Sequence, residues 1–386
     1  TIYDANSVGG AFINSAGAIL ATANNGLASA KLINVTMAND SEIYADGVNN
    51  QTITVTSNNS SNTTVNLLLH ASTVESLALS GNAPLIIDID GADISTETVT
   101  TNNSNAVLRL LGANADLTNI AQSIDIWLKN HDGKTLVVKS NQDFFIDAEQ
   151  VQTSTFGVLT FDHMTNATSS TNNLINLKSH DTNTTNSDTT SNIAGLNFKD
   201  VQAVTFDTSS GTNIDITANL TGDDLKTVNF VGSGRFDMNL HTITGSNSSR
   251  VVFDGSSATG AVSIEANGTV NGVANIKTGA GSDLIRVGGV TADAAGIIIA
   301  SGAGNDIIRI LSGGDGATAK LNLNGGDGND ILQLDPGVDL SSSNVTLASI
   351  EEILLTAGGQ SQKIAASDIS GQSFKISENG SGIITL

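Results

Sequence analysis

Short apolar runs alternate with stretches of Asn, Ser, Thr and Gly along most of the chain, and helical periodicity is hard to find. Runs rich in Val, Ile, Leu, Thr and Phe occupy, for example, 53–56, 65–69, 85–89, 136–138 and 383–386. Short runs of this kind, bounded by turn-forming residues, are typical of β-strands. The pattern therefore predicts an all-β protein.

A looser repeat gives many of these strands a common layout, in which one apolar residue and two or three polar residues precede the strand. It is found in VESLAL (74–79), IDIWL (124–128), VQAVTF (201–206), LKTVNF (225–230) and IEEILL (350–355). Units this short cannot bury their apolar side alone and are stabilised by stacking on one another. We therefore expect a right-handed parallel β-solenoid, or β-roll, with irregular spacing between its coils.

Three copies of one glycine–aspartate pattern lie in the C-terminal third of the chain. They read TGAGSDLIR (278–286), SGAGNDIIR (301–309) and GGDGNDILQ (325–333). Each fits G-G-x-G-x-D-x-U-x, the calcium-binding turn of parallel β-rolls, except that Thr278 and Ser301 replace the first glycine. Successive copies are 23 and 24 residues apart, and a near-constant period of this size indicates one coil per copy.

Stacking the three copies would place like charges next to one another. Parallel strands lie about 4.8 Å apart, so Asp283, Asp306 and Asp330 would form a ladder of carboxylates. Two unit charges at 4 Å repel by about 1 kcal/mol in water and about 4 kcal/mol at an effective dielectric constant near 20. Cations between the coils would remove this repulsion, and carboxylate and carbonyl oxygens are the ligands that calcium prefers.

The sequence thus predicts calcium as the cofactor, bound between successive coils in two complete sites. The predicted ligands are the three aspartates of the ladder and the backbone of the turns that precede them. The turn residues are Gly279, Ala280, Gly281, Gly302, Ala303, Gly304, Gly326, Asp327 and Gly328. The alternative interpretation, three ordinary turns with solvated aspartates, does not explain why the GxGxD core is repeated.

Weaker candidates lie elsewhere in the chain. GGDGATAKL (313–321) has the glycines but carries Thr318 in place of the aspartate, and GGVTADAAG (288–296) keeps Asp293 but has Thr291 in place of the second turn glycine. Asp88, Asp90 and Asp93 form an acidic cluster, for which a solvated turn is the simpler interpretation and a further calcium site the alternative.

The charge of the chain limits the kinds of partner that it can bind. The 386 residues include 38 acidic and 16 basic side chains, for a formal net charge of −22. This acidity argues against nucleic acid or an anionic membrane as a partner, since both require a basic surface. It suits divalent cations, and it also increases solubility. The chain has no cysteine, so a disulfide framework is excluded, and no apolar stretch long enough for a membrane-spanning helix.

Catalytic signatures are missing from the sequence. No histidine begins an H-E-x-x-H motif, and no G-x-S-x-G is present. Leu128 occupies the place of the first glycine of a phosphate-binding loop, so Gly133-Lys134-Thr135 does not complete one. We therefore expect a protein that is not an enzyme. The chain begins at Thr1 without an amino-terminal signal peptide, which we expect of a piece of a longer protein.

In residues 276–355 the chain resembles the RTX-type surface-layer proteins of Gram-negative bacteria. The resemblance is carried by TGAGSDLIRV, SGAGNDIIRI, LNGGDGNDILQL and the following ASIEEILL. The rest of the chain is similar only in its Asn/Thr-rich composition and V-x-x-V-x-F units. We accordingly divide the chain into an irregular solenoid (1–250), an RTX-like calcium-binding segment (251–340) and further solenoid coils (341–386).

The resemblance implies a secreted structural protein that assembles with copies of itself, in the presence of calcium, into a two-dimensional lattice over the cell. It also implies type I secretion, and anchoring to lipopolysaccharide through a segment that is not in this chain. Two alternatives stay open: the stalk of a secreted RTX adhesin, and a polysaccharide-degrading β-helix enzyme. Such an enzyme requires paired acids with Lys or Arg nearby, and the low number of basic residues counts against it.

Overall fold

The computed structural model describes the chain in segments separated by gaps. The described residues are 12–13, 19–20, 32–37, 41–44, 52–57, 65–70, 76–90, 98–111, 114–129, 134–147, 156–162, 174–180, 190–216, 220–222, 224–240, 251–266, 273–288, 296–312, 320–341, 344–358, 360–379 and 384–385. Almost all of their secondary structure is β, so the predicted all-β class is confirmed.

Two long sheets run through the molecule. Sheet 1 contains, in spatial order, β1 (Phe12–Ile13), β2 (Ile19–Leu20), β4 (Ser41–Tyr44), β6 (Val65–His70), β8 (Leu85–Asp90), β10 (Ala106–Leu111), β12 (Asp125–Lys129), β14 (Gln142–Asp147), β16 (Leu174–His180), β18 (Ala203–Thr208), β21 (Thr227–Gly232), β23 (Val251–Ala258), β25 (Val273–Lys277), β27 (Ile297–Ala300), β29 (Lys320–Asn324) and β32 (Asn344–Ala348). Sheet 2 contains β11 (Ala115–Asp116), β13 (Thr135–Val137), β15 (Phe156–Asp162), β17 (Thr190–Lys199), β19 (Asn213–Ile216), β22 (Phe236–Leu240), β24 (Val262–Ala266), β26 (Leu284–Val287), β28 (Ile307–Ile310), β30 (Ile331–Leu334), β33 (Glu352–Thr356) and β35 (Lys375–Asn379), with β20 (Leu220–Gly222) beside β17.

Two smaller sheets accompany them. One contains β3 (Leu32–Met37), β5 (Thr52–Ser57), β7 (Ser76–Gly81) and β9 (Thr98–Thr101), and the other β31 (Asp339–Leu340), β34 (Gln362–Ile364) and β36 (Ile384–Thr385). A short helix, α2 (Ala366–Ile369), follows β34. No helix in the described parts of the chain is both long enough and apolar enough to cross a membrane.

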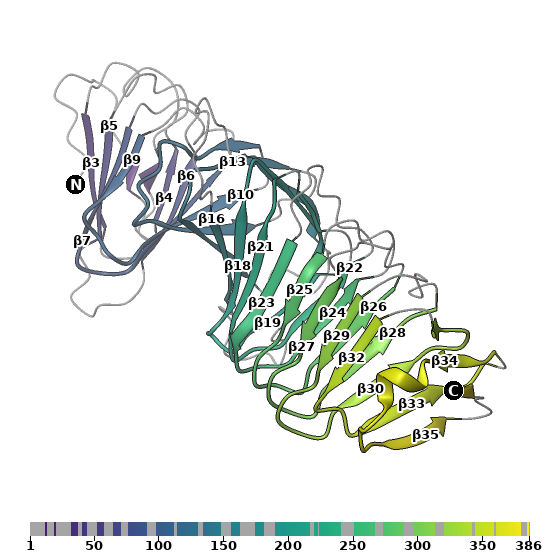
Figure 1. Ribbon diagram of the computed structural model, residues 1–386. Helices are drawn as coiled ribbons and strands as arrows, with labels where there is room; N and C mark the ends of the chain where they lie inside the picture. The colour runs from purple at the N-terminus through teal and green to yellow at the C-terminus, as the bar shows by residue number, and fades with distance from the viewer. Residues whose placement is uncertain are drawn as a thin grey trace.

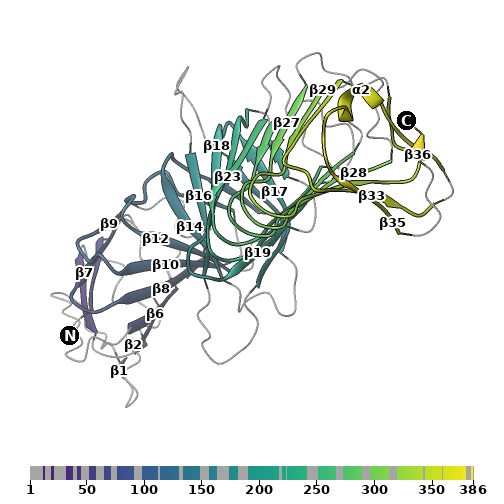
Figure 2. The same cartoon turned by 60° about the horizontal axis from the view of Figure 1, so that its bottom comes forward.

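The strands stack as a parallel β-solenoid, which confirms the predicted architecture. Neighbouring strands within each sheet pair in parallel, whereas β1 and β2 pair antiparallel at the N-terminal end. Consecutive strands alternate between sheets, so each coil places one strand beside its predecessor in sheet 1 and another in a second sheet. The molecule is elongated, with the chain ends at opposite ends of the stack (Figure 1). A rotated view shows the coils stacked along its length (Figure 2).

The core is a set of inward-facing rows between the sheets. In sheet 1, Leu177, Phe206 and Phe230 occupy equivalent inward positions on successive strands. The Phe206 and Phe230 rings stack with centroids 6.0 Å apart, and Phe230 and Phe253 follow at 6.2 Å. Burying a side chain of this kind contributes about 1.5–3 kcal/mol. The alternation of buried and half-buried positions, as in β18, is the period-two pattern that a strand requires.

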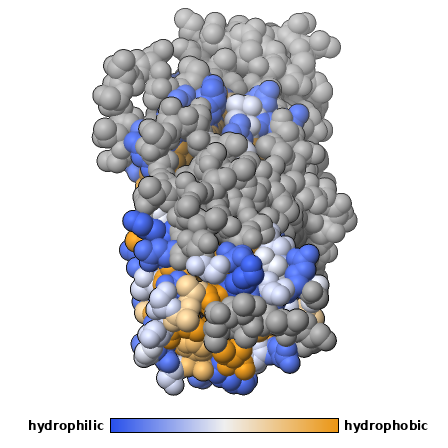
Figure 3. All heavy atoms as spheres, turned by 45° about the vertical axis from the view of Figure 1, so that its right-hand side comes forward, coloured by the Kyte–Doolittle hydropathy of each residue, from blue (hydrophilic) through white to orange (hydrophobic). Residues whose placement is uncertain are grey.

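The apolar residues that precede strands in the looser repeat also belong to this core. Ile124, Val201, Leu225 and Ile350 are all buried. At the C-terminal end, Ile376 of β35 lies opposite buried Ile353 but is 45% exposed, because β35 is the last strand of sheet 2. Apolar side chains gather at this end of the molecule (Figure 3).

A polar corner lies where the chain leaves sheet 1. Ser179 and Thr208 stand at this corner in consecutive coils, and both are buried. The Ser179 hydroxyl donates to the carbonyl of Thr212 at 2.8 Å, and that of Thr208 to the carbonyl of Gly234 at 3.0 Å. In these two coils the corner is thus occupied by a small hydroxyl residue that bonds to the backbone, whereas Gly232 and Ala258 occupy it in the next two.

Sheet pairing continues through both predicted segment boundaries. Strand β21 pairs with β23 across residue 250, and β29 pairs with β32 across residue 340. The solenoid is therefore continuous across residues 250 and 340. The division into 1–250, 251–340 and 341–386 reflects a change in composition and remains a prediction. The weaker calcium motifs fall largely outside the described residues, as does Asp93.

Candidate metal centre

The three glycine–aspartate motifs form the turns that lead from sheet 1 to sheet 2. Residues 278–283 connect β25 to β26, 301–306 connect β27 to β28, and 325–330 connect β29 to β30. In the coil after them, the same connection takes only residues 349–351, so each motif turn is three residues longer than the turn of that coil. In the coil before them, Asp254 pairs with Lys277, and β23 continues beside the first motif turn to Ala258.

The motif aspartates point into the stack and are buried. Asp283, Asp306 and Asp330 are 2%, 1% and 1% exposed. Oδ1 of Asp306 accepts a hydrogen bond from the backbone N–H of Asp283 at 2.8 Å, and Oδ1 of Asp330 accepts one from the N–H of Asp306 at 2.9 Å. Asp283 does the same one coil earlier, with the N–H of Val262 at 2.7 Å. The predicted ladder of carboxylates is therefore present.

The second oxygen, Oδ2, of Asp283, Asp306 and Asp330 is buried and makes no hydrogen bond of ordinary geometry. The hydroxyls of Thr278 and Ser301 lie near the carboxylates of Asp283 and Asp306, but they donate to backbone carbonyls of the next coil instead. Leaving a buried polar atom unsatisfied costs about 1–3 kcal/mol, and more when the group is charged. Three unpaired anionic oxygens in successive coils are thus a local source of instability that a cation would relieve.

The same environment disfavours the charged form of each aspartate. Burial raises the pKa of Asp283 above its ordinary value, although the hydrogen bond from Val262 opposes this effect. Burial, together with the carboxylates of Asp283 and Asp330, raises the pKa of Asp306 to about 6. Burial raises the pKa of Asp330 as well, and the acidic groups of Glu351 and Asp327 add to the effect.

The turn glycines are required because the coils approach closely. Gly302 and Gly326 have φ of 97° and 98°, in the left-handed region that favours glycine. A Cβ atom on Gly302 would lie 2.1 Å from the carbonyl oxygen of Gly279, and one on Gly326 1.9 Å from that of Gly302. Gly304 and Gly328 stack in the same way at the fourth position of the motif. In the first turn, Gly279 and Gly281 lie outside the left-handed region, so only close packing requires them.

Backbone hydrogen bonds join the turns at the third motif position. The N–H of Ala303 donates to the carbonyl of Gly279 at 2.8 Å, and the N–H of Asp327 to that of Gly302 at 2.9 Å. The first turn is joined to the preceding coil through the N–H of Ala280 and the carbonyl of Ala258, at 3.0 Å. These carbonyl oxygens each keep a second lone pair. The side chain of Asp327 is exposed and stands apart from the buried ladder.

This donor set fits calcium better than a transition metal. The described residues contain no group of three or more His, Cys, Asp or Glu side chains that could hold a metal. A cation between the turns would therefore rely on one carboxylate from each coil, with backbone carbonyls and water completing its shell. Calcium accepts such all-oxygen, mixed coordination with six to eight ligands.

Thr278 and Ser301, the departures from the motif at its first position, have a structural role. The Thr278 hydroxyl donates to the carbonyl of Ser301 at 2.7 Å, and the Ser301 hydroxyl to that of Gly325 at 2.8 Å. Both residues directly follow a strand of sheet 1, and each hydroxyl ties its turn to the backbone of the next coil.

Glu351 is a member of the ladder that the sequence analysis missed. Its Oε2 accepts a hydrogen bond from the N–H of Asp330 at 2.7 Å, as the next aspartate does in the preceding coils. The available signal was its position: Glu351 directly precedes β33, just as Asp330 directly precedes β30. The short turn around it lacks the glycine motif that marks the other turns.

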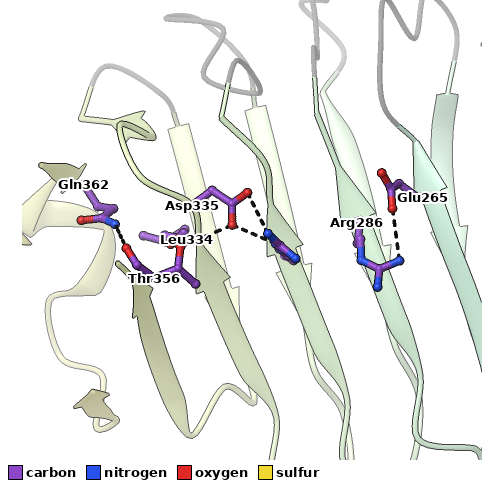
Figure 4. Close-up of polar contacts among 7 residues, drawn as sticks. Glu265, Arg286, Leu334, Asp335, Thr356 and Gln362 are labelled. Carbon is purple, nitrogen blue, oxygen red and sulfur yellow. Dashed lines mark hydrogen bonds and ion pairs between the residues drawn. The ribbon is translucent and has the colours of Figure 1, made fainter. Parts of the chain in front are cut away.

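Two arginines close to the motifs are engaged by other acids. Arg286 bonds to Glu265 at 3.2 Å, and Arg309 forms two bonds with Asp335, at 2.8 and 3.1 Å (Figure 4). Both arginines occupy outward positions on sheet 2. Asp88 is likewise bound by Arg109 through both carboxylate oxygens, which favours the non-metal interpretation of that acidic cluster.

Comparison with protein-family models, with curated proteins and with solved structures found no match for this chain. Its function is therefore inferred from the residues and geometry described above.

Proposed function

We propose that the chain is a structural, non-catalytic protein of a bacterial cell surface, in which calcium stabilises the solenoid and copies of the protein assemble into a two-dimensional lattice. The observation that carries the proposal is the ladder of buried aspartates, each with one oxygen that lacks a hydrogen-bond donor. The resemblance to RTX-type surface-layer proteins supplies the lattice and the secreted, extracellular location.

Calcium supplies the positive charge that the ladder lacks. The residues that would hold it are Asp283, Asp306 and Asp330, with carbonyl oxygens of the turns that precede them. The unfolded chain does not bring these groups together, so metal binding is coupled to folding. A ligand that binds only the folded state stabilises it by about 2.7 kcal/mol at a hundredfold excess over Kd. Low cytoplasmic calcium would thus leave the coils around the motif turns less stable before export, and extracellular calcium would stabilise them.

Assembly depends on the net charge of the molecule. Copies that each carry a formal charge of −22 repel one another at low ionic strength. Monovalent salt screens this repulsion over a Debye length of about 8 Å at 0.15 M. Divalent ions also bridge two acidic surfaces, which screening alone does not do. The proposal therefore requires calcium and not ionic strength in general.

Electron microscopy of the purified protein tests this proposal. One sample contains millimolar calcium, and the other contains sodium chloride of equal ionic strength and a chelator. We expect ordered sheets only with calcium, and none from a variant with Asp283→Asn, Asp306→Asn and Asp330→Asn combined. Sheets that form equally well in both samples would overturn the calcium requirement. Monomers under every condition would favour the adhesin stalk.

One arrangement favours a second candidate, the polysaccharide-degrading β-helix. Asp215 of β19 lies directly opposite Asp237 of β22, and Arg235 binds Asp237 at 2.6 Å. Burial and the neighbouring Asp237 raise the pKa of Asp215. Incubation with neutral and acidic polysaccharides, followed by measurement of reducing ends, tests this candidate. Chain cleavage that is lost in Asp215→Asn would establish it, and the structural proposal expects no cleavage.

A further inference from the structure

The carboxylate ladder does not end at the last glycine–aspartate motif. The N–H of Asp283 is capped by Asp306, that of Asp306 by Asp330, and that of Asp330 by Glu351. Four acidic side chains thus stand in register in four successive coils. These four side chains enclose three gaps between neighbouring coils, whereas the three motif aspartates alone enclose two. At the other end, the ladder begins abruptly, because the N–H that Asp283 caps belongs to Val262, which has no charge.

The third gap contains an unpaired, buried oxygen. Asp330 is 1% exposed, and its Oδ2 has no hydrogen-bond partner. A Cβ placed on Gly325 would lie 2.5 Å from this oxygen and 2.1 Å from the carbonyl oxygen of Ser349. Both oxygens therefore lie beside the same point, at the start of the turn 325–330. Ser349 belongs to the next coil, so oxygens from both coils converge there.

We propose that Glu351 closes a third cation site, between the turns 325–330 and 349–351, for a hard divalent ion of the calcium type. This inference rests on the proposed function, since it extends the same ladder by one gap. The site would use the carboxylates of Asp330 and Glu351 and the carbonyl of Ser349. Carboxylate and carbonyl oxygens are hard ligands, which favour calcium over softer metals.

The third site differs from the first two in its exposure. Glu351 is exposed, whereas Asp283, Asp306 and Asp330 are buried. The turn 349–351 is also three residues long, so it offers fewer carbonyls than a motif turn. Charge interactions are weaker where solvent enters. The third site therefore binds more weakly than the other two and fills last.

Calcium stoichiometry tests this inference directly. Equilibrium dialysis and calorimetric titration with calcium chloride use the whole chain in 0.15 M sodium chloride, which limits diffuse binding to the acidic surface. We expect three bound ions in the parent, two of them tight and one weaker. In Glu351→Gln we expect two, because the amide keeps an oxygen acceptor for the N–H of Asp330 but removes the charge.

Glu352→Gln is the matched control. Glu352 is the next residue, but its side chain bonds to Ser377 and Lys375 on the outer side of β33. This variant is expected to keep all three ions. Two ions in both the parent and Glu351→Gln would overturn the third site and leave the proposed function standing. No bound calcium in the parent would overturn both. The parent stoichiometry decides between two and three sites even if Glu351→Gln does not fold.

Discussion

The two oxygens of each motif aspartate have opposite effects on stability. Oδ1 satisfies a backbone N–H of the preceding coil, whereas Oδ2 brings unpaired negative charge into the stack. Substitution by asparagine separates the two effects, because the side-chain amide retains an acceptor oxygen and is neutral. The central residue Asp306 is the best place for this test, since it lies between Asp283 and Asp330.

We predict that Asp306→Asn is more stable than the parent without calcium and gains less stability from calcium. Burial and the neighbouring carboxylates raise the pKa of Asp306 to about 6. Each unit of pKa shift corresponds to about 1.4 kcal/mol, so removing the charge stabilises the calcium-free protein by roughly 3 kcal/mol. Thermal melting of calcium-free and calcium-loaded protein measures both effects.

Asp254→Asn is the control for this prediction. Hydrogen bonds from Ser256 lower the pKa of Asp254, so its charged form is favoured in the folded protein. The same substitution there lowers stability slightly, with or without calcium. A calcium-free Asp306→Asn protein that melts below the parent would contradict the interpretation of Oδ2 as an unfavourable charge.

The pH dependence of stability follows from the same residue. The folded-state pKa of Asp306 lies near 6 and its ordinary value is 3.8, so between these values the folded protein binds more protons than the unfolded chain. Stability of the calcium-free protein therefore falls as pH rises from about 4 through 6. Melting curves of dialysed, metal-free protein between pH 4 and 8 measure this loss. The slope should be shallower in Asp306→Asn, and an unchanged slope would exclude Asp306 as its source.

At the scale of the element, the stacked turns need glycine mainly because there is no room for a side chain, and less because of the backbone conformation. Gly302 and Gly211 have similar φ, 97° and 85°. A Cβ on Gly302 would lie 2.1 Å from the carbonyl oxygen of Gly279, whereas one on Gly211 would meet nothing within 4 Å. Comparison of Gly302 with Gly211 therefore separates the effect of close packing from the effect of backbone conformation.

We predict that Gly302→Ala destabilises the calcium-loaded protein severely and Gly211→Ala only mildly. An L-residue in the left-handed region costs about 1–2 kcal/mol, which is the whole effect expected at Gly211. At Gly302 the backbone clash adds to this cost and forces adjacent turns apart, so calcium affinity falls as well. Melting temperature and calcium Kd of the two variants test this. Equal losses of stability would show that conformation alone matters.

Much of this element was predictable from the sequence. Strand alternation and the spacing of the motifs indicated the stacked coils and the aspartate ladder. The role of Thr278 and Ser301 was not predictable, because the carbonyls that their hydroxyls contact lie 23 and 24 residues further along the chain, in the next coil. Glu351 was missed for a similar reason: its turn is short and has no glycine, and only the stack aligns it with Asp330.

At the scale of the whole molecule, stability is nearly a sum of contacts between neighbouring coils. Calcium bound at the turns 278–283, 301–306 and 325–330 therefore stabilises nearby coils most. We predict that calcium slows amide hydrogen exchange in β26, β28 and β30, and leaves β8, β10 and β12 almost unchanged. Exchange measured by mass spectrometry, with sodium chloride of equal ionic strength as the reference, tests this. Uniform protection along the chain would show instead that the solenoid opens as a single unit.

The direction of the carboxylate ladder has a consequence for biosynthesis. Every capping acid lies later in the chain than the amide that it caps: Asp306 serves Asp283, Asp330 serves Asp306, and Glu351 serves Asp330. A ribosome delivers the amino-terminal partner of each pair first, so each motif turn waits for the following coil before its amide is satisfied. The series closes only when Glu351 has been made, and the turns are therefore ordered in sequence along the chain, each one coil behind its own synthesis.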